Sequence, residues 1–287
     1  MCAIGSTFIA AATAAVLLAA PAALGAPVVR GSVEQVHVTG APPGARAVLL
    51  HRGDRVAARR AGRRGGVVFR HVRPGRGYRV RVGTRRPSRA VRVLGTRAAP
   101  PSTRRYAQRL PAGGYGYLTT RDGTKLAVNV TLPGPADQGP YPTLVEYSGY
   151  GYANPAGGES SIQAVLRLLG YAVVDVNMRG TGCSGGAFDY FEPLQSLDGY
   201  DVVETVARQP WVLNGKVGMA GVSYGGISQL FVAATRPPSL AAITPLSVID
   251  STQTTLYPGG ILNTGFALSW AKDRVHDARP ASPSGGQ

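Results

Sequence analysis

The alternation of apolar and polar residues changes in character near residue 110. Before this point the chain carries short runs with a two-residue period, separated by turns such as Ala41-Pro42-Pro43-Gly44. Such runs between Gly and Pro turns are typical of half-buried β-strands. They predict a small all-β, immunoglobulin-like domain over residues 27–97, whose strands are Ser32 to Thr39, Arg46 to His51, Gly66 to Val72, Gly77 to Val82 and Ala90 to Leu94.

Beyond residue 110, continuous apolar runs alternate with segments of helical period. This order favours an α/β domain with a mainly parallel sheet and crossover helices. A hairpin with its turn at residues 121–124 precedes this pattern. The expected buried strands are Thr143 to Tyr147, Tyr171 to Val176, Val217 to Ala220 and Leu240 to Leu246, and the expected helices are Ser161 to Leu169, Asp198 to Gln209 and Ile227 to Thr235.

The beginning of the chain is typical of a secretory signal. An apolar run from Phe8 to Leu18 is followed by small residues that allow cleavage near Gly25, although the first seven residues contain no Lys or Arg. A short transmembrane anchor is the alternative, but the run is below spanning length. We expect residues 1–26 to be a signal peptide and the protein to be secreted or in the cell envelope. The predicted divisions after the β domain are a linker over residues 98–111, an α/β domain over 112–250, and a helix with a polar tail over 251–287.

The net charge of +16 is divided unevenly between these domains. Residues 27–110 contain 21 Arg and two acidic residues, whereas residues 111–287 contain 10 Lys or Arg and 13 acidic residues. Arginines that alternate with valines, as in Tyr78 to Val82, predict strands with one cationic face. This face is either only a solvated surface or a binding site for an anionic polymer of the cell envelope. Nucleic acid is not expected as a partner, because stacking aromatic residues are scarce.

Cysteine and histidine positions indicate neither a disulfide nor a metal site. Cys2 would leave with the signal, so Cys183 would stand alone in the mature chain. His37, His51 and His71 have no metal-ligand spacing. The Gly-rich segment after Asn177 resembles a phosphate loop, but no P-loop lysine follows it. We therefore expect no cofactor and no metal.

One stretch carries the candidate chemistry, the sequence Gly221-Val222-Ser223-Tyr224-Gly225. It matches G-x-S-x-G, and it lies between a predicted buried strand and a predicted helix. In that setting the motif is a nucleophile elbow, a strained turn that raises the serine hydroxyl above the sheet. The alternative is a Gly-rich turn in which the serine only caps the helix.

Several spaced motifs together resemble a known family. They are Arg121-Asp122-Gly123, the loop Met178 to Gly186, and the run from Gln209-Pro210-Trp211 to Gly226. Over residues 112–270 the chain resembles the X-prolyl dipeptidyl-peptidase and cocaine-esterase group of α/β hydrolases. The resemblance implies a partial α/β-hydrolase fold, with the start of a helical cap at Gly259 to Lys272. It also implies a serine hydrolase that cleaves esters or amides, including X-Pro peptides in some members.

The resemblance assigns roles to three residues. Ser223 matches the nucleophile, and the backbone N–H of Tyr224 matches one oxyanion donor. Tyr150, in the loop after the strand Thr143 to Tyr147, matches the tyrosine whose hydroxyl is the second donor. Tyr152 is a neighbour that could take this place, and Tyr150 could also be an ordinary loop aromatic.

The acid and base of a triad are not evident. An α/β hydrolase supplies them after the serine, in the order Asp or Glu, then His. Asp250 and His276 have this order, but the family places the two residues after later strands. We expect this sequence to be the N-terminal part of a longer enzyme, with both residues beyond Gln287, and to be inactive alone. The alternative is a non-catalytic envelope protein whose basic domain binds anionic polymers.

Overall fold

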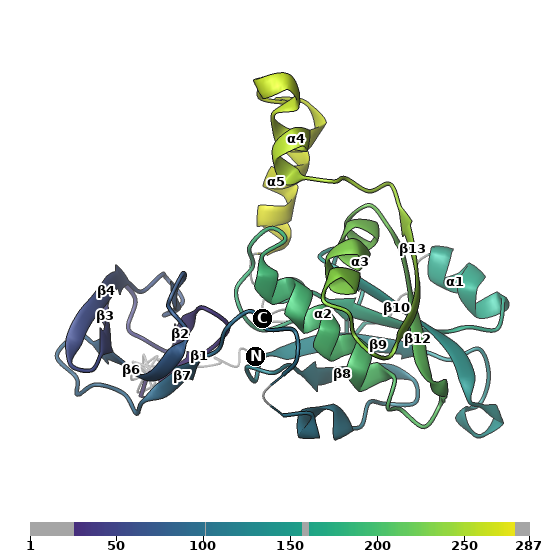
Figure 1. Ribbon diagram of the computed structural model, residues 1–287, viewed down its shortest axis with the longest axis horizontal. Coiled ribbons are helices and arrows are strands. Elements are labelled where there is room, and N and C mark those ends of the chain that lie inside the picture. The colour runs from purple at the N-terminus through teal and green to yellow at the C-terminus, as the bar shows by residue number, and fades with distance from the viewer. Residues whose placement is uncertain (1–25, 101, 157–160, 279–287) are drawn as a thin grey trace, which may run out of the picture.

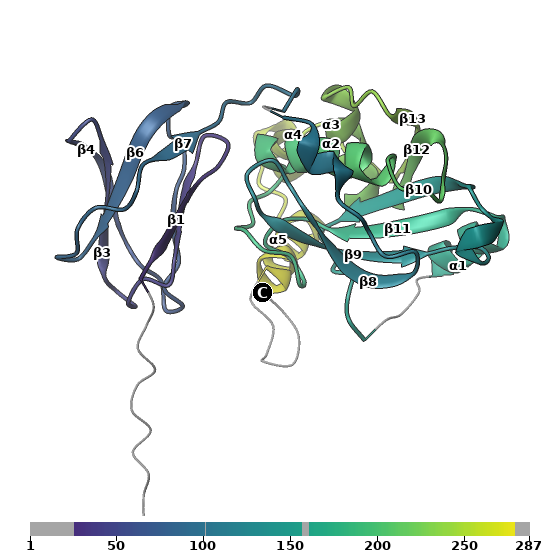
Figure 2. The same ribbon diagram turned by 90° about the horizontal axis from the view of Figure 1, so that it is seen from below.

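The computed structural model describes residues 26–100, 102–156 and 161–278, and they form two bodies that lie side by side (Figure 1 and Figure 2). The N-terminal body contains only strands, whereas the second combines a six-stranded sheet with helices. The predicted order, a small all-β domain before a mainly parallel α/β sheet, is confirmed. The predicted signal peptide lies outside the described residues except for Ala26, and so does most of the polar tail.

The N-terminal body is a sandwich of two antiparallel sheets with the orders β1-β2-β5 and β4-β3-β6-β7. Inward-facing residues of both sheets, among them Val38, Leu49, Phe69 and Val80, form one core. Their alternation with exposed residues explains the two-residue period of the sequence. The strands are β1 (Val28–Gly31), β2 (Val36–Thr39), β3 (Arg46–His51), β4 (Asp54–Arg60), β5 (Val67–Phe69), β6 (Gly75–Val82) and β7 (Val91–Val93).

Two features of the sandwich differ from the prediction. The predicted strand Ser32 to Thr39 is wrong in its first half, because the N–H of Ser32 donates to the carbonyl of Gln35 and closes a turn in which Glu34 has φ 51°. β4 is not predicted at all. It is an edge strand rich in arginine, and an edge strand that buries little apolar surface carries a weak alternation.

The second body is built on a sheet with the order β13-β12-β10-β11-β9-β8. β10 pairs in parallel with β11 on one side and β12 on the other, and β12 pairs in parallel with β13. The chain therefore moves one way after β10 and the opposite way after β11, and right-handed crossovers place the connecting helices on opposite faces. The strands are β8 (Gly114–Thr119), β9 (Lys125–Thr131), β10 (Tyr141–Ser148), β11 (Ala172–Asn177), β12 (Val212–Val222) and β13 (Leu240–Leu246).

The helices follow the predicted order with two corrections. α2 begins at Pro193 rather than at Asp198, because proline suits the first helical position, and no acidic residue lies in its first turn. The predicted cap helix over 259–272 is wrong at its start. Pro258 and two glycines with positive φ hold a short 3₁₀ turn there, and the helix begins only at Phe266. The bounds are α1 (Ser161–Leu168), α2 (Pro193–Val206), α3 (Tyr224–Ala234), α4 (Thr252–Leu256), η3 (Pro258–Gly260) and α5 (Phe266–Asp277).

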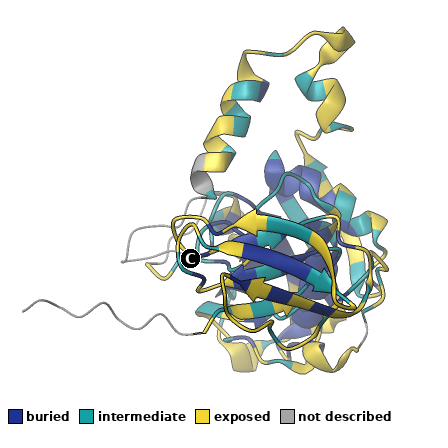
Figure 3. Cartoon of the chain, turned by 90° about the vertical axis from the view of Figure 1, so that its left-hand side faces the viewer, coloured by how far each residue is buried: buried dark blue, intermediate teal, exposed yellow. Residues whose placement is uncertain are grey.

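α4 and α5 project from the body as two largely exposed helices (Figure 3). Among the described residues no helix is both long and apolar enough to cross a membrane.

Buried charges join the two bodies. Arg179, which is fully buried, donates to both carboxylate oxygens of Asp198 and to Asp122, and Asp122 also accepts a hydrogen bond from Ser32 of the sandwich (2.5 Å). Burial raises the pKa of Asp122, but the charge of Arg179 and these hydrogen bonds outweigh burial and hold it well below its usual range. The segment between the bodies is also anchored, because the Tyr106 hydroxyl of η1 (Arg104–Ala107) donates to Asp201 (2.6 Å).

Candidate active site

Ser223 lies at the junction between β12 and α3. Its backbone has φ 57° and ψ −117°, a conformation that residues other than glycine rarely adopt. The N–H of Ser223 donates to the carbonyl of Leu246 (2.9 Å), and its own carbonyl accepts from Ile227 (2.7 Å). The strained turn is therefore held from both sides, by β13 and by the first turn of α3. This is the geometry of a nucleophile elbow.

Two glycines make the tight turn possible. A Cβ atom on Gly221 would lie 3.0 Å from the backbone carbon of Gly225, so the strand and the helix touch across the turn. A Cβ on Gly226 would lie 2.3 Å from the carbonyl oxygen of Leu246, which leaves no room for any side chain. Close approach of α3 to β13 thus depends on Gly226, a position outside the G-x-S-x-G motif.

Tyr150 reaches the serine from the loop after β10. β10 and β12 are neighbours, and the chain leaves them in opposite directions, so their carboxyl ends form the switch point where α/β sheets bind ligands. The Tyr150 hydroxyl donates to Oγ of Ser223 at 2.9 Å, and the N–H of Tyr224 lies 3.5 Å from the same hydroxyl oxygen. The structure thus brings together all three residues that the sequence singled out.

The rival tyrosine, Tyr152, lies further from the reaction centre. Its ring centroid is 5.8 Å from that of Tyr150, and no hydrogen bond joins it to Ser223 among the described residues. Burial is the main cause that raises the pKa of Tyr152 to about 12. The geometry therefore favours Tyr150 as the donor.

Helix α5 adds two side chains that the sequence did not point to. Nε1 of Trp270 donates to the Tyr150 hydroxyl (3.3 Å), and the guanidinium of Arg274 lies 4.7 Å from the centroid of the Tyr150 ring. A hydroxyl group that accepts a hydrogen bond becomes a stronger donor in the hydrogen bond that it gives. The only sequence signal was that Trp270 is one of two tryptophans in the chain.

An apolar cavity of about 240 Å³ opens beside the serine hydroxyl. Its lining comes from the loop between β11 and α2, from the elbow and α3, from the segment after β13, and from α4 and α5. No acidic or basic side chain belongs to this lining among the described residues. The principal apolar and aromatic lining residues are Phe191, Ile227, Ile249, Leu256, Phe266 and Trp270.

Beneath the elbow lies a buried carboxyl group, that of Glu146 on β10. It is 6% exposed, and a Cβ on Gly225 would lie 3.4 Å from its Oε1. Burial raises the pKa of Glu146 to about 7, against a weaker opposing effect of the hydrogen bond from Gln163. Sequence reasoning did not single out this residue, which directly follows the apolar residues Leu144 and Val145 of β10.

The described histidine side chains do not approach Ser223. His37, His51 and His71 all belong to the N-terminal sandwich. His276 lies in α5, but its side chain is outside the described set. Asp250 is exposed, and its carboxylate accepts a hydrogen bond from Thr254 (2.9 Å). A triad of Asp250 and His276 therefore stays a hypothesis.

Within the described residues no group of three or more His, Cys, Asp or Glu could hold a metal ion.

Comparison with known proteins gives the family. The sequence profile described as X-Pro dipeptidyl-peptidase (S15 family) matches residues 122–286. The chain belongs to this family. Its matched region contains the elbow, Tyr150 and both α5 residues at the site, whereas the sandwich precedes it. The predicted resemblance to this group of proteins is confirmed.

Individual relatives agree with this assignment. The cocaine esterase of a Rhodococcus species is 34% identical over 155 residues, which are 53% of this chain and 26% of the esterase. A Mycobacterium bovis protein provisionally named a serine esterase is 31% identical over 181 residues, 54% of this chain and 28% of that protein. The crystal structure of a CocE/NonD family hydrolase from Staphylococcus aureus superposes with a TM-score of 0.52 at 29% identity, over 57% of this chain and 33% of that one. The chain thus spans about a quarter of the length of the curated relatives it matches.

Proposed function

We propose that this S15-family chain carries the nucleophile and the oxyanion hole of a serine hydrolase that acts through an acyl-enzyme on Ser223. The observation that carries the proposal is a contact between three groups at a strained elbow: the Tyr150 hydroxyl donates to Oγ of Ser223, and the Tyr224 N–H faces the oxygen of that same tyrosine hydroxyl. Donors fixed in this way stabilise the negative charge that develops on a carbonyl oxygen during acyl transfer.

The chemistry proceeds in two steps. Oγ of Ser223 attacks the carbonyl carbon of the substrate, a base takes the hydroxyl proton, and the oxyanion is held by Tyr150 and Tyr224. The leaving group departs with a proton from the same base, and water then releases the acyl group from Oγ. The base is an imidazole in related triads. Because no described histidine side chain reaches Ser223, we expect the chain alone to turn over ester substrates barely above background.

The cavity favours an ester with an uncharged apolar acyl group over an X-Pro dipeptide. A dipeptidyl substrate carries a free α-ammonium group, and a buried ammonium needs a carboxylate or several carbonyl acceptors. The lining of the cavity is apolar and aromatic, and the part that the structure describes offers no carboxylate. Aromatic and aliphatic side chains bind an apolar acyl group by burying its surface.

Hydrolysis in the presence of imidazole tests this function, because added imidazole can serve as the base. The Ser223-dependent rate is the rate of the chain minus that of Ser223→Ala at the same imidazole concentration. We expect this rate to be measurable with p-nitrophenyl butyrate and to be much lower with Gly-Pro-p-nitroanilide. Equal or faster cleavage of the dipeptide would contradict the ester preference, and an unchanged rate in Ser223→Ala would contradict the function.

A further inference from the structure

The outward side of the sheet β4-β3-β6-β7 carries a ladder of arginines. Cross-strand partners share one side of a sheet, and Leu49 and Val80 mark the inner side, so the outer side follows from the register. One row joins Arg79, Leu50 and Arg55, the next joins Arg81, Val48 and Ala58, and the last joins Arg46 and Arg60. We call the five exposed arginines of these rows the cationic face: Arg46, Arg55, Arg60, Arg79 and Arg81.

The middle of the cationic face is apolar but closed to water. Val48 points outward, away from the core of the sandwich, and yet it is only 7% exposed. Its cross-strand neighbours are Arg81 and Ala58, so the aliphatic part of an arginine side chain covers it. At Val48 the outward side of the sheet therefore exposes little apolar surface.

The charge of this face is not neutralised within the protein. Among the described residues none of its five arginines forms an ion pair, and the domain has only Glu34 and Asp54 as acids. Arg60 and Arg79 donate to backbone carbonyls, those of Gly44 (3.1 Å) and Ser88 (2.9 Å). Arg46 lies directly opposite Arg60, and like charges in this arrangement destabilise a strand pair. An external anion would remove this repulsion.

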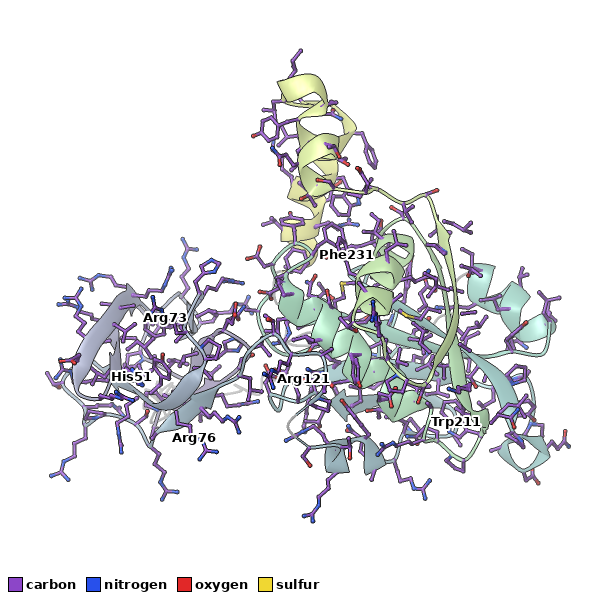
Figure 4. The ribbon with its side chains drawn as sticks, in the orientation of Figure 1. His51, Arg73, Arg76, Arg121, Trp211 and Phe231 are labelled. Atoms are coloured by element: carbon purple, nitrogen blue, oxygen red, sulfur yellow. The ribbon has the colours of Figure 1, made fainter. Side chains whose placement is uncertain are left out.

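We propose that the cationic face is the docking surface for an extended polymer of phosphate groups. All 18 basic residues of residues 27–97 are arginines, and a guanidinium binds a phosphate through two parallel hydrogen bonds where an ammonium acts as a point charge. The arginines are spread over three strands, so only a chain of linked anions can contact them together. Side chains with nitrogen tips extend outward all around this body in Figure 4.

Two other classes of partner fit this surface less well. Single-stranded nucleic acid is bound by aromatic platforms, and the register places no aromatic residue among the rows of the face. A lipid membrane favours exposed apolar or aromatic side chains that enter the interface, whereas Val48 is covered and Leu50 is half-buried. The surface therefore matches a flexible phosphate polymer best.

The test measures binding of end-labelled inorganic polyphosphate to the whole chain by fluorescence anisotropy over a series of salt concentrations. The face variant is Arg46→Gln, Arg55→Gln and Arg81→Gln, three arginines that make no side-chain hydrogen bond among those the structure describes. The matched control, Arg63→Gln, Arg64→Gln and Arg85→Gln, removes the same charge from exposed turns of the same body. Thermal unfolding confirms that both variants fold.

The proposal predicts that the dissociation constant for polyphosphate is about tenfold or more higher for the face variant than for the parent chain. Its dependence on salt concentration should also be weaker, because a complex with fewer phosphate contacts releases fewer counterions when it forms. The control variant should raise the dissociation constant by less than about threefold, because it weakens only the long-range electrostatic attraction. Tripolyphosphate should bind much more weakly than the long chain. An equal loss of affinity in the face variant and in the control variant, or no binding of polyphosphate to the parent chain at low salt, would overturn the proposed docking surface. Tighter binding of duplex DNA at equal phosphate concentration would overturn the class of partner.

Discussion

The hydroxyl of Tyr150 lies 2.9 Å from Oγ of Ser223, although 73 positions separate the two residues in the sequence. The contact arises because β10 and β12 are adjacent parallel strands whose carboxyl ends meet at one edge of the sheet. Each residue lies just beyond its strand, and the two crossover connections leave this edge in opposite directions, which opens space for a ligand.

Removal of the Tyr150 hydroxyl should impair the transition state rather than substrate binding. Tyr150→Phe is expected to lower the Ser223-dependent kcat by roughly 10²–10³-fold, with a much smaller change in KM, because an oxyanion donor acts mainly on the developing charge. The assay is imidazole-supported hydrolysis of p-nitrophenyl butyrate. Tyr152→Phe is the matched control and should stay close to the parent. A large fall in kcat for Tyr152→Phe, with Tyr150→Phe close to the parent, would make Tyr152 the oxyanion donor instead.

Trp270 should act on the reaction through Tyr150. Trp270→Phe keeps an aromatic ring in the cavity but removes the N–H that donates to the Tyr150 hydroxyl. We expect kcat to fall about 2–10-fold, the effect of one hydrogen bond, with KM almost unchanged. In the Tyr150→Phe background the same substitution should have little further effect. If KM rises while kcat is unchanged, Trp270 only lines the cavity.

The contact between α3 and β13 predicts a large effect of a small substitution. Gly226→Ala would place a Cβ 2.3 Å from the carbonyl oxygen of Leu246, so the backbone of the elbow must move. We expect a loss of about 2–4 kcal/mol in the free energy of unfolding, as for other overpacked sites. Gly113→Ala is the control, because nothing lies within 4 Å of the added atom. Similar denaturation midpoints for both variants would contradict the packing described for the elbow.

Glu146 should make stability fall as the pH rises. Its pKa is about 7 in the folded chain and ordinarily 4.5, so the folded state binds the extra proton between these values. Stability from this group is therefore full below about pH 4.5 and is lost as the pH rises through 7. Glu146→Gln removes the titration and should be more stable than the parent by about 1–3 kcal/mol near pH 8. The two proteins should differ little near pH 4. A constant difference across this range would contradict the burial of an ionisable group.

Much of the fold is visible in the sequence because the buried strands are continuous apolar runs. β11 and the hairpin of β8 and β9 lie within two residues of their predicted bounds. β13 also has its predicted bounds, but the prediction that it is buried is wrong, because β13 is an edge strand and its residues are half-buried or exposed. The misses have local causes. The cap helix was predicted to begin at Gly259, but Gly259 and Gly260 have positive φ, which a helix does not allow. β4 was missed because its arginines lie at the exposed edge of a sheet, where burial does not impose an alternation.

The site was predictable only as far as its motifs reach. Ser223 and Tyr224 follow from one local pattern, and Tyr150 required a resemblance to known hydrolases. Trp270 and Arg274 come to Tyr150 from a helix 120 residues or more along the chain, through tertiary packing that no local pattern encodes. Glu146 was hidden for a similar reason, since only the approach of Gly225 shows that its carboxyl group lies beneath the elbow.

Covalent labelling distinguishes Ser223, the proposed nucleophile, from the other serine of the cavity. The chain is incubated with a fluorophosphonate in the presence of imidazole, and the modified residue is identified by peptide mapping and mass spectrometry. Ser247 is the internal control, because it also has a positive φ and lines the same cavity. We expect an adduct on Ser223 that forms more slowly in Tyr150→Phe and at an unchanged rate in Ser247→Ala. Label on Ser247 with Ser223 unmodified would contradict this expectation.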